Sequence, residues 1–215
     1  MPPADPTPED IDRYADASTT AAPEDLRRLD EETRRSLSSP QMLSGTVVGR
    51  LLETLVWLRR PRLVLEIGTY SGGSALWMAR GLPDGGRIVS CELDPERADF
   101  AEAQIARAGM AGRIEVRRGP ALATIRALEG PLDLVFVDAD KTGYPAYYEE
   151  VVPRLARDGL LVADNTLMSG RVIDPDPTDA SATAIAAFNA RAASDARVVA
   201  TLLTVRDGVT LVRPA

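Results

Sequence analysis

The most informative absence in the 215-residue sequence is histidine, of which there is none. Its absence excludes Ser-His-Asp and Cys-His nucleophilic sites, and zinc sites built on imidazole. Proton transfer must then fall to Lys, Asp, Glu, Tyr or water, and a metal site must be built from oxygen ligands. The single cysteine, Cys91, cannot form an internal disulfide, so we expect a cytoplasmic protein.

Long apolar runs and basic clusters are also missing. No stretch is long and apolar enough to span a bilayer, and the first residues lack the pattern of a secretory leader, so no membrane association is expected. The 25 Lys and Arg residues are outnumbered by 32 Asp and Glu residues, which gives a net charge of -7. The Arg pairs are scattered among acids, which predicts solvated helix faces and no nucleic-acid partner.

The first forty residues differ from the rest of the chain. They are polar and rich in proline at the start, and a Ser-Ser-Pro break follows at 38–40. Helices are predicted over 8–17, 23–37 and 44–60. We therefore divide the chain into an N-terminal arm with lid or dimer helices, residues 1–40, and a main domain, residues 41–215.

From residue 62 onward, short apolar runs alternate with amphipathic segments. Strands are predicted over 63–67, 87–91, 114–116, 132–137 and 160–163. Helices are predicted over 74–80, 95–108, 121–128 and 145–157. Continuous apolar runs in such an alternation indicate a parallel sheet that is covered on both faces.

The C-terminal end has a different pattern. After a helix predicted over 181–193, two apolar runs at 198–205 and 209–212 are joined by Arg206-Asp207-Gly208. Asp-Gly between β-branched runs is a strong hairpin signal. The predicted fold is α/β and Rossmann-like, with a mostly parallel seven-stranded sheet that ends in an antiparallel hairpin and has helices on both faces.

A glycine loop follows the first strand of this sheet. Gly68 and Gly72 allow the backbone to turn tightly and approach a ligand, and Ser74 either caps the next helix or contacts that ligand. The glycine spacing departs from the dinucleotide fingerprint, and Glu66 stands inside the strand. A carboxylate there repels a pyrophosphate but attracts an ammonium or sulfonium group. The alternative is a turn that merely requires glycine.

A second acid, Glu92, follows the second strand. Nucleotide-binding α/β folds carry a ribose-binding acid at this place, and a carboxylate can accept hydrogen bonds from both ribose hydroxyls. The alternative is a solvated acid at a strand end.

Polar residues also follow the fourth and fifth strands. Asp138 comes directly after one, and Asp164 and Asn165 end the other. If these strands are neighbours, two carboxylates and an amide oxygen converge, which suits Mg²⁺, or Mn²⁺ or Ca²⁺ in the same oxygen site. The alternative is that the acids cap the helices that follow.

Four motifs, in this order, resemble the metal-dependent catechol and caffeoyl-CoA O-methyltransferases. They are Glu-Ile-Gly-Thr-Tyr-Ser-Gly from Glu66, Val-Asp-Ala-Asp-Lys-x-x-Tyr from Val137, Asp-Asn-Thr-Leu from Asp164 and Asp-Gly-Val-Thr from Asp207. The order and spacing match from about residue 42 to the end. The resemblance implies a class I methyltransferase fold for residues 41–215, S-adenosylmethionine as cofactor, an aromatic small-molecule acceptor and a homodimer.

The resemblance also assigns roles to individual residues. Lys141 matches the catalytic lysine of the family. Asp138, Asp164 and Asn165 match its metal ligands. The expected cofactor contacts are Ser44, Glu66, Gly68, Ser74, Glu92, Ala121 and Asp138.

The predicted reaction is metal-assisted methylation of a catechol hydroxyl, with Lys141 accepting the proton or holding the oxyanion. Gly73 stands where an aromatic residue is common in the family, and Gly143 and Met168 depart from residues common in its plant members, which leaves the acceptor open. Met168 either forms a wall of the acceptor pocket or packs under its loop. The rival functions are a nicotinamide-dependent oxidoreductase, which the glycine spacing disfavours, and a non-catalytic cofactor-binding protein.

Overall fold

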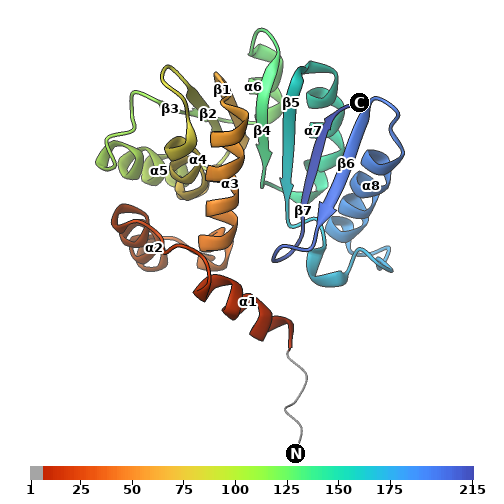
Figure 1. Ribbon diagram of the computed structural model, residues 1–215, viewed down its shortest axis with the longest axis horizontal. Coiled ribbons are helices and arrows are strands. Elements are labelled where there is room, and N and C mark those ends of the chain that lie inside the picture. The colour runs from red at the N-terminus through yellow and green to blue at the C-terminus, as the bar shows by residue number, and fades with distance from the viewer. Residues whose placement is uncertain (1–6) are drawn as a thin grey trace, which may run out of the picture.

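The computed structural model describes residues 7–215 and arranges them around one seven-stranded sheet (Figure 1). Residues 1–6, the start of the predicted arm, lie outside the described residues. The strands are β1 (Leu63–Ile67), β2 (Arg87–Glu92), β3 (Ile114–Arg118), β4 (Leu132–Val137), β5 (Leu155–Asp164), β6 (Val198–Leu203) and β7 (Val209–Pro214). Their order is β3-β2-β1-β4-β5-β7-β6. The first five are parallel, and β7 pairs antiparallel with β5 and β6, so the predicted fold class is confirmed.

Helices cover both faces of the sheet, as predicted. The α-helices of residues 7–215 are α1 (Pro8–Ala17), α2 (Glu24–Ser36), α3 (Gly45–Arg59), α4 (Gly73–Gly81), α5 (Pro95–Arg107), α6 (Ala121–Ala127), α7 (Tyr144–Val151) and α8 (Ala180–Ser194), and α1 lies outside the two layers. The elements α2 to α5 share one hydrophobic core, and α6 to α8 share the other. Neighbouring strand residues enter opposite cores, Val64 the first and Leu65 the second, because side chains alternate along a strand.

The prediction of a helix through residue 157 is wrong. Helix α7 ends at Val151, a 3-10 turn covers Val152–Arg154, and β5 already begins at Leu155. Pro153 lacks an amide donor and so cannot continue the helical ladder. Two exposed polar residues, Arg157 and Asp158, interrupt the early part of β5, and therefore no apolar run marks it in the sequence.

The predicted C-terminal hairpin is confirmed, with a longer connection than Asp-Gly alone requires. Strand β6 ends at Leu203 instead of residue 205, and residues 204–208 form the loop. Arg206 and Gly208 in this loop have φ angles of 50° and 88°. Within residues 7–215, no helix combines the length and the apolar character needed to cross a membrane.

Candidate functional site

The carboxyl ends of β1, β4 and β5 meet at one edge of the sheet. Register pairs join Ile67 to Val137 and Val137 to Ala163. The residues that follow these three are therefore brought to the same edge, and they are Gly68, Asp138 and Asp164. The condition set for the predicted metal site, that the two strands be neighbours, is met.

Gly68 is required by the close approach of the β1 and β4 ends. Its φ is 101°, and a Cβ atom on it would lie 2.1 Å from the main-chain oxygen of Asp138. The amides of Gly68 and Thr69 both donate to the carbonyl of Cys91 at 3.1 Å, which fixes the loop to β2. Only glycine fits this position without moving a strand end.

Glu66 is completely buried beneath this loop. Its Oε2 accepts a hydrogen bond from the Ser90 hydroxyl, and its Oε1 has no hydrogen-bond partner within residues 7–215. Burial, with a smaller contribution from the charges of Asp138 and Glu92, raises the pKa of Glu66 to about 7. A buried acceptor without a partner is costly unless a ligand donates to it.

Glu92 is held rigidly at the end of β2. Its Oε2 accepts from the amide of Tyr70 at 2.7 Å, and its Oε1 accepts from the amide of Asp94 at 3.0 Å. The Glu92 carbonyl accepts from the amide of Gly119 at 2.8 Å, which brings the turn before Ala121 next to this acid. The carboxylate keeps lone pairs with which it can accept from a diol.

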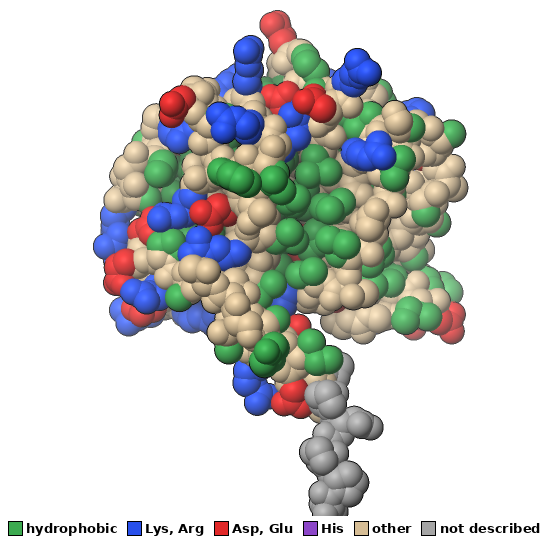
Figure 2. Space-filling view, in the orientation of Figure 1, with side chains coloured by type: hydrophobic (Ala, Val, Ile, Leu, Met, Phe, Trp, Pro, Cys, Tyr) green, Lys and Arg blue, Asp and Glu red, His purple; other side chains and the backbone are tan. Residues whose placement is uncertain are grey.

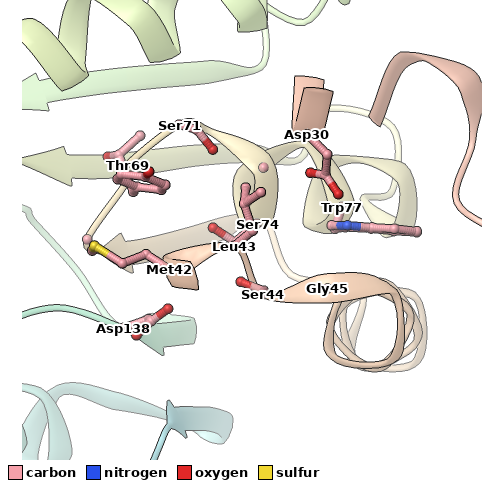
Figure 3. Close-up of a pocket in the computed structure, with 13 residues that line it drawn as sticks. Asp30, Met42, Leu43, Ser44, Gly45, Thr69, Ser71, Ser74, Trp77 and Asp138 are labelled. Atoms are coloured by element: carbon pink, nitrogen blue, oxygen red, sulfur yellow. The ribbon is translucent and has the colours of Figure 1, made fainter. Parts of the chain in front are cut away.

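A pocket lies between the β1–α4 loop and the start of α3 (Figure 3). Four of the predicted cofactor contacts line it: Ser44, Gly68, Ser74 and Asp138. Glu66 lies in the strand beneath its floor, whereas Glu92 and Ala121 stand further along the same edge, over β2 and at the start of α6. The structure thus distributes the seven predicted residues along the edge from β4 to β2.

Among the lining residues that were not predicted as cofactor contacts, two come from helices that pack beside the pocket. Asp30 comes from α2, and Trp77 comes from α4. A Cβ atom on Gly49 would lie 2.3 Å from the Trp77 ring, so this glycine permits the close packing of α3 on α4. Asp30 has no sequence signal, since it is one acid among many on a polar helix.

A second, larger cavity of about 640 Å³ adjoins the first and shares Asp138 and the segment 42–44 with it. Lys141 and all three predicted metal ligands line this cavity. The remaining lining residues come from segments far apart in the sequence, and they are Asp12, Gln41, Val48, Ala139, Ser169, Arg206 and Asp207.

Lys141 contacts one of the predicted metal ligands. Its Nζ donates to Asp138 Oδ1 at 2.9 Å and to the Tyr144 hydroxyl at 2.8 Å. Lys141 is also the only lysine in the sequence, in which every other basic residue is arginine. Arginine cannot release a proton in a protein, so Lys141 is the only basic side chain of the sequence that can exchange one. The presence of a single lysine is visible in the sequence, but the prediction of Lys141 rested on the motif alone.

Asp164 supplies a buried negative charge to the cavity. It is 3% exposed, and its Oδ1 accepts from the amide of Asn165 at 2.8 Å. Burial, reinforced by the charge of Asp138, raises the pKa of Asp164. Asp138 and Asp164 are neighbouring carboxylates in this lining, and carboxylate oxygens are ligands that suit a divalent cation such as Mg²⁺.

Asn165 completes the candidate donor set. The described residues contain no group of three or more His, Cys, Asp or Glu side chains placed to hold a metal, so the set depends on this amide oxygen and on oxygens from water or substrate. Asn165 has a φ of 57°, a conformation that asparagine tolerates better than most residues.

The loop after Asn165 is fixed from two sides. The amides of Thr166 and Leu167 donate to the carbonyls of Gly208 and Asp207, and Asn189 of α8 donates to the Thr166 carbonyl at 2.8 Å. Met168, predicted either to wall the acceptor pocket or to pack under the loop, is 6% exposed and belongs to the core under α8. Its neighbour Ser169 faces the cavity instead.

Both N-terminal helices reach the two pockets. Asp30 of α2 lines the smaller one, and Asp12 of α1 lines the larger one. Arg206 lies 3.5 Å from Asp12 and 3.6 Å from Asp16, which links α1 to the β6–β7 loop across the larger cavity. Residues near the start of the chain therefore belong to the site.

Known proteins agree with this geometry. A sequence model described as O-methyltransferase matches residues 15–215. A catechol O-methyltransferase from Niastella koreensis is 38% identical over 160 residues, which cover 72% of each chain. Another from Mycobacterium tuberculosis is 38% identical over 180 residues, 82% of this chain and 81% of that one. A probable caffeoyl-CoA O-methyltransferase from Dictyostelium discoideum is 32% identical over 192 residues, covering 86% and 84%.

Solved structures give the same result. A Podospora anserina methyltransferase with SAH bound superposes with a TM-score of 0.90 at 30% identity, covering 100% of this chain and 98% of that one. An O-methyltransferase from Bacillus cereus in complex with SAH has a TM-score of 0.83 at 31% identity, covering 95% and 97%. This chain therefore belongs to the O-methyltransferase family, whose members use S-adenosylmethionine as methyl donor.

Proposed function

We propose that this enzyme methylates one hydroxyl of a catechol-type aromatic molecule, with a divalent cation held by Asp138, Asp164 and Asn165. The observation that carries the proposal is the shared lining of the larger cavity by these three residues and Lys141. Asp138 also lines the smaller pocket, so the acceptor site and the cofactor site adjoin there. The catechol and caffeoyl-CoA enzymes among the relatives support the same acceptor class.

The cofactor contacts follow from the smaller pocket and the edge beside it. Ser44, Gly68, Ser74 and Asp138 contact the methionine part of S-adenosylmethionine. Glu66 adds negative charge under the cationic end, Glu92 accepts hydrogen bonds from the ribose hydroxyls, and Ala121 lies at the adenine. Membership of the O-methyltransferase family argues against the alternative of a nicotinamide cofactor.

The chemistry needs an ionised hydroxyl aligned with the methyl group. Asp138, Asp164 and Asn165 would hold a divalent cation, which would supply a Lewis acid that favours the ionised form of the bound hydroxyl. Lys141, held by Asp138, takes the hydroxyl proton in its amine form and later releases it to solvent. The acceptor oxygen then bonds to the methyl carbon while the carbon–sulfur bond breaks and its electron pair stays on sulfur, which leaves a neutral thioether.

A small panel of acceptors tests this assignment. Catechol should be methylated once in the presence of S-adenosylmethionine and Mg²⁺, whereas phenol and resorcinol, which lack a vicinal pair, should react far more slowly. Mass spectrometry of the products measures this directly. Equal turnover of phenol and catechol would contradict a catechol-type site. Cofactor binding without any methylation would favour the non-catalytic alternative.

We further propose a homodimer. Support comes from apolar residues that stay exposed on a sheet edge and on α3: Trp57 and Leu58 are 63% and 64% exposed, and Val199 of β6 is 43% exposed. Figure 2 shows hydrophobic side chains gathered in the region between α3 and β6. Analytical ultracentrifugation at micromolar concentration should give twice the mass of the chain, and a monomer there would contradict the assembly.

A cytoplasmic location is proposed for the enzyme, because its single cysteine, Cys91, is a free and buried thiol.

Residues 1–40 are proposed to serve the site as a lid or a dimer contact. Asp30 lines the cofactor pocket, and Leu26 and Leu29 enter the core beside α3 and α4. Deletion of residues 1–39 should therefore weaken cofactor binding and lower the melting temperature. A truncated protein with unchanged affinity, stability and mass would make the segment an accessory tail.

A further inference from the structure

One buried tyrosine joins the groups that the proposed reaction needs. Tyr144 begins α7 and is 1% exposed. Its hydroxyl accepts a hydrogen bond from Lys141 Nζ at 2.8 Å. The same oxygen lies 2.9 Å from the carbonyl of Asp164 and 3.1 Å from the carbonyl of Val137. A single side chain thus contacts the catalytic lysine and the ends of both strands that carry the carboxylates.

The hydroxyl of Tyr144 is a donor to the main chain and an acceptor for the lysine at once. Its one proton is directed at the carbonyls of Val137 and Asp164, and its lone pair faces Lys141. A carbonyl oxygen can only accept a hydrogen bond, so the hydroxyl proton must be shared between these two acceptors, and the lysine must donate to the lone pair. The direction of each hydrogen bond is therefore fixed.

Two consequences follow for the cavity. Val137 immediately precedes Asp138, so a hydroxyl shared between its carbonyl and that of Asp164 keeps the two strand ends at a constant spacing. With Nζ hydrogen-bonded to both Asp138 and Tyr144, Lys141 has one remaining position, and it lines the cavity. Partners of this kind orient metal ligands and catalytic groups without touching the substrate.

We propose that Tyr144 is a positioning residue, which sets the spacing of Asp138 and Asp164 and aims the Lys141 amine at the acceptor. This inference rests on the proposed function, because it needs Lys141 and the cation site to act together. It assigns to Tyr144 no contact with the acceptor or the cofactor, since Tyr144 lines neither pocket.

The chain offers a matched control for this residue. Tyr148 lies one turn further along α7 and is also 1% exposed. Both rings pack edge-to-face on Phe188 with centroids 5.7 Å apart. The Tyr148 hydroxyl, however, donates to Asp195 at 3.0 Å, on the far side from the cavity. Tyr144→Phe and Tyr148→Phe therefore remove the same atom from the same core, and only one of them changes the site.

The experiment compares wild type, Tyr144→Phe and Tyr148→Phe in three measurements: kcat and KM with catechol, the Kd of Mn²⁺ by calorimetry in the presence of SAH, and the melting temperature. Both variants should lose some thermal stability. Only Tyr144→Phe should lower kcat and weaken Mn²⁺ binding, each by about tenfold to a hundredfold, because partners of metal ligands have effects of this size. Its KM for S-adenosylmethionine should stay within about twofold of wild type, because it touches no cofactor contact.

The outcomes separate the inference from the function on which it rests. Wild type that binds Mn²⁺ and methylates catechol, with Tyr144→Phe indistinguishable from Tyr148→Phe in kcat and Kd, would overturn the inference alone. Losses in both variants that parallel the melting temperature would also overturn it, since they would reflect stability only. Wild type that neither binds Mn²⁺ nor methylates catechol would overturn the proposed function and the inference together.

Discussion

The cofactor half and the acceptor half of the site are built in different ways. Around β1 and β2 the chain is local and rigid: Gly68 packs against the backbone of Asp138, and both oxygens of Glu92 accept main-chain amides. The acceptor half is a wide cavity whose walls come from α1, from the loop after β5 and from the β6–β7 loop. The cofactor is the same in every reaction, so its pocket can be rigid. Acceptors differ between enzymes, and loops on a rigid scaffold are the parts that vary to bind them.

Gly68→Ala should have the largest effect, because it tests the rigid half directly. A methyl group there meets the carbonyl of Asp138 at 2.1 Å in a left-handed backbone conformation. We expect a loss of about 3 kcal/mol or more in unfolding free energy and no measurable cofactor binding. Chemical denaturation and calorimetry with SAH check both. Gly170→Ala, whose φ is also positive but whose Cβ would meet open space, is the control and should lose far less.

Lys141→Arg comes next and addresses the acceptor half. Arginine keeps the positive charge beside Asp138 but cannot accept a proton. If Lys141 is the base, kcat for catechol should fall by about a hundredfold or more while the Kd of SAH is unchanged. Since Lys141 is the only lysine, its amine also gives a single side-chain signal in a ¹⁵N-lysine spectrum, which shows directly whether the acceptor perturbs it. A variant with near-normal kcat would make the role of Lys141 purely electrostatic.

Glu66→Gln should have an intermediate, pH-dependent effect on the cofactor half. Burial raises the pKa of Glu66 to about 7 from an ordinary value of 4.5. Because the pKa of Glu66 is higher in the folded state, protonation of this side chain stabilises the ligand-free protein. This contribution is fully present below pH 4.5 and is lost as pH rises through about 7. The wild type should therefore lose melting temperature relative to Glu66→Gln as pH rises from 4.5 to about 7, with little further change above that.

Cofactor affinity should change in the opposite direction. The ionised form of Glu66 attracts the cationic cofactor, so binding of S-adenosylmethionine to wild type should tighten as pH rises through about 7. Glu66→Gln should bind about tenfold more weakly at pH 8 and show a flatter pH profile. Parallel profiles for the two proteins would show that another group controls the pH dependence.

Arg206→Gly should have the smallest effect, because it lies at the rim of the acceptor half. The ion pairs of Arg206 with Asp12 and Asp16 are long and partly exposed, and glycine suits its φ of 50°. We expect unfolding free energy to change by less than about 0.5 kcal/mol and the catechol KM by less than about threefold. A larger change in KM, at either low or high salt, would show that α1 controls access to the cavity.

The two halves also differ in how far the sequence predicts them. The motifs around Glu66, Gly68 and Glu92 are local, because each consists of a strand and the turn that follows it. The strand order then brings these three residues to one edge of the sheet. Asp138, Asp164 and Asn165 were predicted in the same way, and the structure brings them to one cavity. Their roles as cofactor contacts and metal ligands stay predictions.

Residues that act through tertiary contacts escaped the sequence argument. Asn189 and Asp30 have no pattern of their own, because their partners lie on other elements. Tyr144 ends the motif that begins at Val137, but only its contacts with the ends of β4 and β5 indicate a role for it. The start of β5 was missed because the exposed residues Arg157 and Asp158 separate it from the apolar part of the strand. For Met168 the sequence offered a wall or a core position, and only the packing under α8 decides for the core.

The rate of catechol methylation as a function of free Mg²⁺ tests the central claim most directly. The measurement uses full-length protein, saturating S-adenosylmethionine and excess chelator, with Mg²⁺ then added back. We predict no turnover in chelator, saturable recovery with Mg²⁺, and no recovery for Asp164→Ala although it still binds SAH. Full turnover in excess chelator, or recovery in Asp164→Ala equal to that of the exposed control Asp174→Ala, would contradict a catalytic cation at Asp138, Asp164 and Asn165.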